Sequence, residues 1–380
     1  MVKSHKTIRK EVLGRVRRVV VKVGSSMLAS VDKGLNPQAF AHLAREISEL
    51  KHQGYEIVLV SSGAIAAGMG KLGYKTRPQS IAQKQATAAV GQSRLMNIYE
   101  THFSHHQQMV AQILLTRDDL SHRQRFLNAR NTLLTLLGLG IVPIINENDT
   151  VAVEEIQFGD NDNLSALITN LIEADLLIIL TDIDGLCDAD PRVHPEAKCI
   201  PLVEDIDQDM GDRVGDTRGE ATVGGMVSKI EAAQKASRFG IPTIIAGGKR
   251  EGVLHQILKG KQIGTLILPK VETLSSRKHW IAFNLKPQGE IAVDAGAKKA
   301  VVQKGKSLLA SGVVQIKGTF DRGDSVSCLG PQGREFARGL VNYSAVELRQ
   351  IKGLRSGQIE KMLGYKYSDE VIHRDDLVVL

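Results

Sequence analysis

The 380-residue sequence has few aromatic residues, few cysteines and no long hydrophobic run. Aromatic side chains make up only 4% of the chain, so the core must consist mainly of Val, Ile, Leu and Ala. That composition suits an α/β sheet that is buried on both faces. The most apolar stretches, such as residues 176–180, are far shorter than a membrane span, and no signal-peptide segment follows the basic start. We therefore expect no association with a membrane.

The three cysteines, Cys187, Cys199 and Cys328, are odd in number and lack the spacing of metal ligands. We interpret them as reduced thiols, which favours a cytoplasmic location, and we predict no metal site made by the protein alone. The net charge is +7, and residues 270–380 contribute +6 of it. A basic C-terminal part permits RNA as a partner, although an ordinary solvated surface is the favoured explanation for a charge of this modest size.

Two common nucleotide-binding motifs are missing. No Walker P-loop exists, and the apparent G-x-G-x-x-G run from Gly68 to Gly73 stands in the wrong place. A dinucleotide fingerprint must follow its strand directly, whereas here the strand is expected to end at Val60. We therefore exclude dinucleotide binding.

Strand and helix patterns alternate through the first two thirds of the chain. Apolar β-branched runs predict strands at residues 18–23, 56–60, 141–145, 176–180, 242–246 and 265–268. Helical spacing predicts helices around residues 81–100, 126–138, 163–173 and 226–239. Residues 151–158 resemble a small strand or hairpin arm. This order indicates an α/β domain with a mainly parallel sheet sandwiched by helices.

The pattern changes after Pro269. Residues 269–287 have no clear periodicity, and short glycine-punctuated strands follow at residues 290–293, 313–317, 325–329 and 335–341. We therefore predict an α/β domain at residues 1–268, a linker at 269–287, a small mostly-β domain at 288–368 and a tail at 369–380.

Polar and glycine-rich segments stand at the predicted C-terminal ends of the strands, where open α/β sheets bind ligands. Lys22 ends the first strand just before Gly24, and a second glycine turn includes Ser62. Bare backbone amides at such turns can bind anions. The clusters at residues 146–149 and 159–163 add acidic and amide groups that suit an ammonium group, lysines or Mg²⁺. Thr181 and Asp182 end another strand, and residues 224–229 begin a helix.

Together these segments resemble the glutamate 5-kinase family of the amino acid kinase superfamily. The similar motifs are Val20-Val-Lys-Val-Gly-Ser-Ser26, Ser61-Ser-Gly-Ala-Ile-Ala-Ala-Gly68, Asn146-Glu-Asn-Asp149, Gly159-Asp-Asn-Asp-Asn-Leu-Ser-Ala166 and Gly224-Gly-Met-x-x-Lys229. The C-terminal part is similar to a PUA domain, and the resemblance implies that residues 1–268 are the catalytic domain. The resemblance extends through the whole chain, and five motifs in order make it specific.

The resemblance implies an ATP-dependent kinase that uses Mg²⁺ and phosphorylates the γ-carboxylate of L-glutamate, the first step of proline biosynthesis. It implies proline as feedback inhibitor and γ-glutamyl phosphate reductase as a hand-over partner, and we also expect a homo-oligomer. Lys22, Lys229 and Asp162 would be catalytic, and Ser62, Asp149 and Asn161 would bind the substrate. The positions that would bind the nucleotide are Thr181, Asp182, Val223, Gly224, Gly225, Met226, Val227, Ser228 and Lys229. Val223 departs from the family's usual threonine.

Two other interpretations of the sequence remain open. An N-acetylglutamate kinase or an aspartokinase would share the fold, although Asp149 has no charged partner on an acetylated nitrogen. A protein that acts mainly through RNA binding by its PUA-like domain would need another explanation for the first 269 residues.

Overall fold

The computed structural model describes residues 4–30, 34–152, 160–189, 194, 196–206, 225–269, 281, 285 and 287–380. Contacts within the chain divide it into two compact units, residues 1–273 and 274–380. The division lies close to the change in pattern after Pro269.

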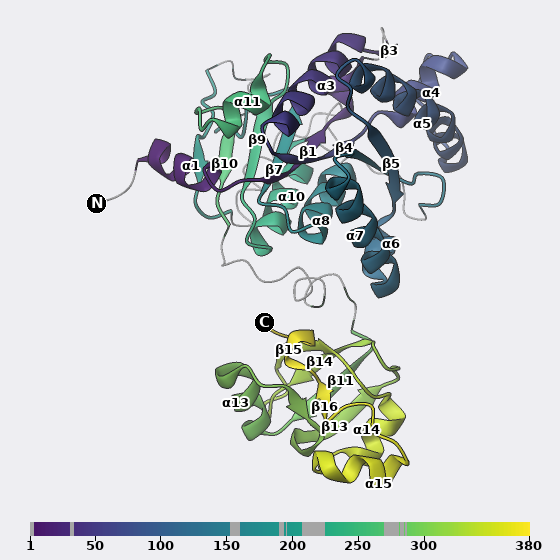
Figure 1. Cartoon of the computed structure of the whole chain (residues 1–380), viewed down its shortest axis with the longest axis vertical. Coiled ribbons are helices and arrows are strands. Elements are labelled where there is room, and N and C mark those ends of the chain that lie inside the picture. Colours follow the sequence, from purple (N-terminus) through teal and green to yellow (C-terminus); the bar gives the residue numbers. More distant parts are fainter. Residues whose placement is uncertain are drawn as a thin grey trace. The chain divides into compact units, whose positions relative to one another are not determined.

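A mainly parallel sheet forms the centre of the larger unit (Figure 1). In the described residues the strand order is β5-β6-β4-β1-β7-β9-β10-β8, and β10 alone runs antiparallel to its neighbour β9. The strands are β1 (Arg18–Val23), β4 (Glu56–Ser61), β5 (Val110–Leu115), β6 (Val142–Glu147), β7 (Leu176–Thr181), β8 (Leu202–Val203), β9 (Thr243–Gly247) and β10 (Thr265–Ile267). A separate small pair consists of β2 (Ala29–Ser30) and β3 (Gly34–Leu35).

Helices cover both faces of this sheet. Figure 1 shows α3 and α5 on one side and α7, α8 and α10 on the other. The helices are α1 (His5–Leu13), α2 (Ser25–Leu28), α3 (Pro37–His52), α4 (Ala64–Leu72), α5 (Ile81–Ser104), α6 (Arg117–Ser121), α7 (Arg123–Gly138), α8 (Asp160–Leu171), α10 (Met226–Arg238) and α11 (Val253–Leu258). The predicted α/β sandwich is therefore confirmed.

Strand β1 lies between β4 and β7, and this position brings the polar segments together. Lys22 is in register with Val60 of β4 and Ile179 of β7, and all three strands run in the same direction. Alternate residues of β1 face opposite sides of the sheet. Val19, Val21 and Val23 join the core cluster that also contains Phe40 of α3. Lys22 therefore faces the side covered by α8.

Two glycines of the apparent dinucleotide fingerprint lie inside a helix, and the third is its C-cap. Gly68 and Gly70 belong to α4, which packs closely along α5. A Cβ atom on Gly68 would stand 1.9 Å from the carbonyl oxygen of Thr87, and one on Gly91 would stand 1.8 Å from that of Ala64. Close helix packing explains Gly68 and Gly91, and Gly68 and Gly70 do not form the turn directly after a strand that a dinucleotide fingerprint requires.

The second unit is built around a five-stranded sheet of order β13-β11-β14-β15-β17 in the described residues. The strands of this sheet are β11 (Gly289–Val293), β13 (Val313–Gly318), β14 (Ser325–Leu329), β15 (Glu335–Leu340) and β17 (Leu377–Val379). A separate antiparallel pair consists of β12 (Leu308–Leu309) and β16 (Glu370–Ile372). The helices of this unit are α13 (Ala295–Lys304), α14 (Ala345–Ile351) and α15 (Ile359–Leu363), with short 3₁₀ turns η2 (Ala310–Gly312), η3 (Ser356–Gln358) and η4 (Arg374–Asp376).

Several expected elements differ from the structure. Residues 369–380, expected as a tail, contain β16 and β17, and β17 pairs antiparallel with β15 as the edge of the sheet. The sequence prediction also omitted the edge strand β5 and the helix α13. The Asp294 side chain caps α13 by accepting a hydrogen bond from the Ala297 amide. Of the expected arm at residues 151–158, all but Val151 and Ala152 lies outside the described residues.

The tight contact between α4 and α5 gives a testable prediction. Gly91→Ala should lower the free energy of unfolding by about 3 kcal/mol or more, because its methyl group has no room beside the Ala64 carbonyl. Gly70→Ala is the matched control, since its nearest neighbour would be the Arg94 guanidinium at 3.7 Å. We expect this control to be neutral or to stabilise α4 by up to about 1 kcal/mol. Urea unfolding of both variants measures the difference between their free energies of unfolding. Equal values would show that Gly91 is not needed for the close contact between α4 and α5.

Candidate functional site

Asp162, in the first turn of α8, has a carboxylate at the centre of a buried cluster of charges. Its Oδ1 atom lies 2.6 Å from Nζ of Lys22, and its Oδ2 atom lies 3.5 Å from Nζ of Lys229. The side chains of Lys22, Lys229 and Asp162 are only 5%, 10% and 1% exposed. Three side chains that are distant in the sequence thus meet on the face of the sheet that α8 covers, near the C-terminal end of β1.

Helix α10 contributes more than Lys229 to this cluster. The Ser228 hydroxyl donates a hydrogen bond of 2.7 Å to Oδ2 of Asp162, and Lys229 Nζ donates one of 2.8 Å to the carbonyl oxygen of Gly225. The nucleotide-binding role expected of Ser228 stays a prediction, and in the structure its hydroxyl binds Asp162. Ser228 therefore helps to fix α10 against α8.

The cluster has two ammonium groups and one carboxylate. Burial lowers the pKa of Lys22; Asp162 opposes this lowering, and the charge of Lys229 adds to it. A buried cation without full compensation costs free energy. One further negative charge would balance these three side chains, so an anionic ligand at this point would be strongly favoured.

A chain of polar side chains connects the ends of β4, β6 and α8. Nδ2 of Asn161 donates to Oγ of Ser62 at 3.0 Å and to Oδ1 of Asn146 at 2.9 Å. Asn146 in turn donates to Oε1 of Gln92 on α5 at 2.9 Å. Oδ1 of Asn161 is buried and has no hydrogen-bond partner among the described residues. Ser62 and Asn161 are therefore brought together as predicted, and one buried amide oxygen is left for another donor.

Asp149 lies in the turn after β6, half-buried. Its charge acts on Arg77: desolvation lowers the pKa of Arg77, and Asp149 opposes that lowering. Arg77 precedes α5 in a segment without regular structure. Sequence reasoning missed Arg77, because a single arginine between two helices has no spacing that marks it.

The end of β7 presents Thr181 and Asp182, whose side chains hydrogen-bond to each other at 3.1 Å. The Gly248 amide donates to the carbonyl oxygen of Thr181, so the segment after β9 borders the same strand end. A Cβ on Gly247 would lie 2.6 Å from Oδ1 of Asp184, which shows how closely the two segments approach.

The remaining predicted nucleotide positions belong to the start of α10. Gly225 is the N-cap of this helix, Met226 begins it, and the Val227 side chain is exposed. Val223 and Gly224 lie outside the described residues. The first backbone amides of a helix have no acceptor within the helix. At the start of the 13-residue helix α10 these amides lie near Lys229 in the sequence, and the helix dipole adds positive potential there.

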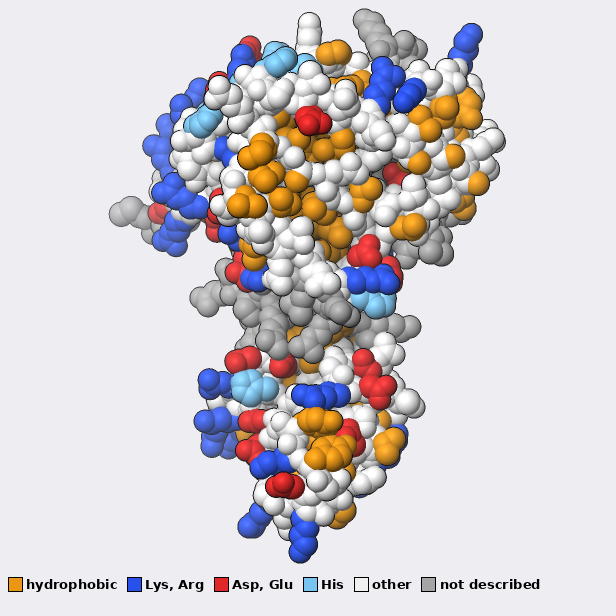
Figure 2. Space-filling view, turned by 45° about the vertical axis from the view of Figure 1, so that its right-hand side comes forward, with side chains coloured by type: hydrophobic (Ala, Val, Ile, Leu, Met, Phe, Trp, Pro, Cys, Tyr) orange, Lys and Arg blue, Asp and Glu red, His pale blue; other side chains and the backbone are white. Residues whose placement is uncertain are grey.

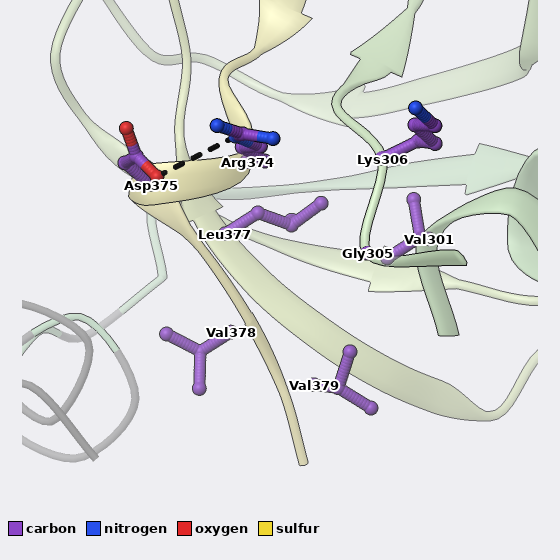
Figure 3. A pocket seen from close by; sticks show the side chains of 8 residues that line it. All are labelled: Val301, Gly305, Lys306, Arg374, Asp375, Leu377, Val378 and Val379. Carbon is purple, nitrogen blue, oxygen red and sulfur yellow. Dashed lines mark ion pairs between the residues drawn. The ribbon is translucent and has the colours of Figure 1, made fainter. Parts of the chain in front are cut away.

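The second unit has a hollow of its own. On the face shown in Figure 2, Lys and Arg side chains are interspersed with Asp and Glu over this unit. Figure 3 shows the hollow between the end of α13, η4 and β17. It is lined by Val301, Gly305, Lys306, Arg374, Asp375, Leu377, Val378 and Val379. It contains none of the residues of the Asp162 cluster, which belongs to the larger unit.

Comparisons with known proteins identify the families to which the two units are similar. The amino acid kinase family model matches residues 17–247, and the PUA domain model matches residues 289–363. A curated glutamate 5-kinase of Geobacter sulfurreducens is 54% identical over 373 residues, which is 98% of this chain and 100% of that protein. The chain belongs to the glutamate 5-kinase family.

Other members of the glutamate 5-kinase family are similarly related. The curated glutamate 5-kinase of Pelobacter propionicus is 51% identical over 98% of this chain and 100% of its own length. That of Caldanaerobacter subterraneus is 53% identical over 96% of this chain and 98% of its own length. The resemblance indicated by the motifs is confirmed. Among the described residues, no helix is both long enough and apolar enough to cross a membrane.

Proposed function

We propose that this protein transfers the γ-phosphoryl group of ATP to the γ-carboxylate of L-glutamate, forming γ-glutamyl phosphate in the first step of proline biosynthesis. Similarity to curated glutamate 5-kinases over nearly the whole chain is the observation on which the proposal rests. The buried Lys22–Asp162–Lys229 cluster supports it, because a site short of negative charge suits a phosphate group.

The chemistry requires positioning more than proton transfer. A glutamate carboxylate is ionised at neutral pH and can attack the γ-phosphorus without a general base. The new bond joins the carboxylate oxygen to phosphorus, while the bond to the β-phosphate oxygen breaks and ADP leaves. Because an anion must approach a polyanion, Lys22 and Lys229 would neutralise the transferring group, and Asp162 would act as a positioning residue.

A magnesium ion would reach this site on the nucleotide. Within the described ranges, no three His, Cys, Asp or Glu side chains are grouped so that they could hold a metal ion. Mg²⁺ commonly binds through substrate phosphates and one or two carboxylates. The side chains of the site therefore fit an ion that the phosphates of ATP hold for the most part. Bound there, Mg²⁺ would supply charge neutralisation of the phosphates.

The polar chain at the ends of β4 and α8 would bind glutamate. Ser62 and Asn161 would hold its carboxylates, and Asp149 would pair with its α-ammonium group. The unpartnered Oδ1 of Asn161 could accept a hydrogen bond from that same ammonium group. Thr181, Asp182 and the segment 223–229 would bind ATP, with the amides at the start of α10 facing its phosphates.

Several partners follow from the proposed reaction. The product is an acyl phosphate, which water hydrolyses, so rapid hand-over to γ-glutamyl phosphate reductase would protect it. Proline, as the end product, would act as feedback inhibitor. Assembly into a homo-oligomer and a cytoplasmic location are part of the same proposal.

A substrate panel tests the proposed activity. The protein is incubated with ATP, Mg²⁺ and either glutamate, N-acetylglutamate or aspartate, and the acyl phosphate is trapped with hydroxylamine. We expect hydroxamate with glutamate and a reduced rate when proline is added. A clear preference for N-acetylglutamate or aspartate would identify another amino acid kinase and overturn the proposal.

The two lysines give a second prediction. Lys22→Ala and Lys229→Ala should each lower kcat by about 100-fold or more, because each removes positive charge beside the transferring phosphoryl group. Lys51→Ala is a control, since this lysine on α3 is half-buried and donates to the carbonyl oxygen of Gly140, away from the Asp162 cluster. Its kcat should stay near that of the unmodified enzyme. Near-normal kcat in a folded Lys22 or Lys229 variant would remove that lysine from the mechanism.

Asp149 gives a third prediction. Asp149→Asn keeps the size of the side chain but removes its charge, so kcat/KM for glutamate should fall about 30- to 1000-fold while KM for ATP stays unchanged. Asp182→Asn is the reciprocal variant, and it should raise KM for ATP while KM for glutamate stays unchanged. An unchanged glutamate KM in Asp149→Asn would show that this carboxylate only shapes the turn.

RNA binding by the second unit is a further, separate proposal. It is supported by the match to the PUA model and by Lys306 and Arg374 at the hollow in Figure 3. Arg374 also pairs with Asp375, Nε to Oδ1 at 3.8 Å, which reduces the charge offered to a phosphate. Titration of structured RNA at low and at physiological salt tests the proposal, and no binding at low salt would refute it.

A further inference from the structure

Two cysteines of the larger unit face each other in the segment between β7 and β8. The Sγ atoms of Cys187 and Cys199 lie 2.6 Å apart, and both cysteines are free. The residues are twelve positions apart in the sequence and form an isolated antiparallel bridge. None of the proposed steps of phosphoryl transfer uses either thiol.

The backbone around the pair has the geometry of a cross-strand disulfide. The Ile200 amide donates to the Leu186 carbonyl at 2.7 Å, and the Asp188 amide donates to the Lys198 carbonyl at 3.1 Å. These bonds flank the cysteines, which therefore form a non-hydrogen-bonded pair. In such pairs the Cα atoms lie about 4.5 Å apart, inside the range of about 4.4–6.8 Å that disulfides span. A disulfide could form without rearrangement of the backbone.

The base of this segment is also fixed to the sheet. The hydroxyl of Thr265 on β10 accepts a hydrogen bond from the Leu186 amide at 2.8 Å and donates one to the Ile200 carbonyl at 2.6 Å. One side chain thus holds both arms of the bridge together. Hydrogen bonds to Thr265 therefore hold the residues next to Cys187 and Cys199 on the same side of β10.

The two thiols differ in access to solvent. Cys199 is exposed, whereas Cys187 is buried, and burial raises the pKa of Cys187 to about 12. A small disulfide in solution can therefore reach Cys199 first. Cys187 lies behind it, in position to attack the mixed disulfide once this has formed.

We propose that Cys187 and Cys199 form a thiol–disulfide exchange site that takes a low-molecular-weight disulfide as its oxidant. The Cys199 thiolate attacks one sulfur of the small disulfide and releases one equivalent of thiolate. The Cys187 thiol then loses its proton to solvent and attacks Cys199 Sγ, which releases the second thiolate. The protein loses two hydrogens, and the small disulfide is reduced to two thiols. The resulting disulfide would link Cys187 to Cys199 in the part of the chain that follows Thr181 and Asp182.

Intact-mass measurement of the folded protein with oxidised glutathione tests this proposal. The unmodified protein should lose about 2 Da, and subsequent unfolding should reveal one titratable thiol in place of three. Dithiothreitol should reverse both changes. Cys328→Ser is the matched control: this cysteine of the second unit is 1% exposed, and its variant should still lose about 2 Da.

Two further variants test the order of attack. Cys187→Ser should stop at a stable glutathione adduct on Cys199, and Cys199→Ser should remain largely unmodified while folded. Thermal melting provides an independent measurement, since the oxidised protein should melt a few degrees above the reduced one. Two results would overturn the proposal: three titratable thiols after prolonged exposure to the oxidant, or a glutathione adduct that persists in the protein without substitutions.

Discussion

The buried carboxylate of Asp162 is the interaction on which the site depends. It is 1% exposed and holds Lys22, Lys229 and the Ser228 hydroxyl at once. Without this anion, two ammonium groups would lie close together in a poorly hydrated place, which is among the costliest arrangements in a protein. With it, the cluster is still short of one negative charge. The two buried ammonium groups therefore explain both why the fold requires the Asp162 carboxylate and why we propose that the site binds a phosphoryl group.

The fold makes this arrangement possible by placing β1 between two parallel neighbours. The valines of β1 that point to one face join the core beneath α3, and Lys22 points to the other face toward α8. The ends of β4, β6 and β7 border the same edge, where Ser62, Asn146 and Thr181 stand. Helices α8 and α10 pack on this face, so their first turns meet at that edge. Gln92, which follows Gly91 in α5, accepts a hydrogen bond from Asn146 at this edge.

Much of this was accessible from the sequence, for identifiable physical reasons. Buried parallel strands have continuous apolar runs, so β1, β4, β6, β7 and β9 were predicted to within one or two residues. That Lys22 and Ser62 lie at one edge of the sheet follows from the rule that the C-terminal ends of parallel strands share that edge. The edge strand β5 was missed because its residues are only partly buried. Strand β17 was missed because three residues at the end of the chain have too little pattern to indicate pairing.

Other features of the site depend on side-chain orientation or on long-range contact. The Ser228 hydroxyl could have faced a nucleotide, and only the packing of α10 on α8 shows that it binds Asp162. Asp149, in the turn after β6, influences Arg77, which precedes α5 and is far away in the sequence. The roles assigned to individual residues came from the family resemblance, and they stay predictions until the variants are measured.

A double-mutant cycle between Lys22→Met and Asp162→Asn, followed by urea unfolding, tests the central role of this pair most directly. Asp162→Asn alone should cost about 3–5 kcal/mol, because it leaves two buried ammonium groups without their counter-charge. The double variant should cost clearly less than the sum of the single changes, with a coupling of at least about 1 kcal/mol. Additivity within about 0.5 kcal/mol would show that the two side chains do not depend on each other, and would contradict a central role for the Asp162 carboxylate.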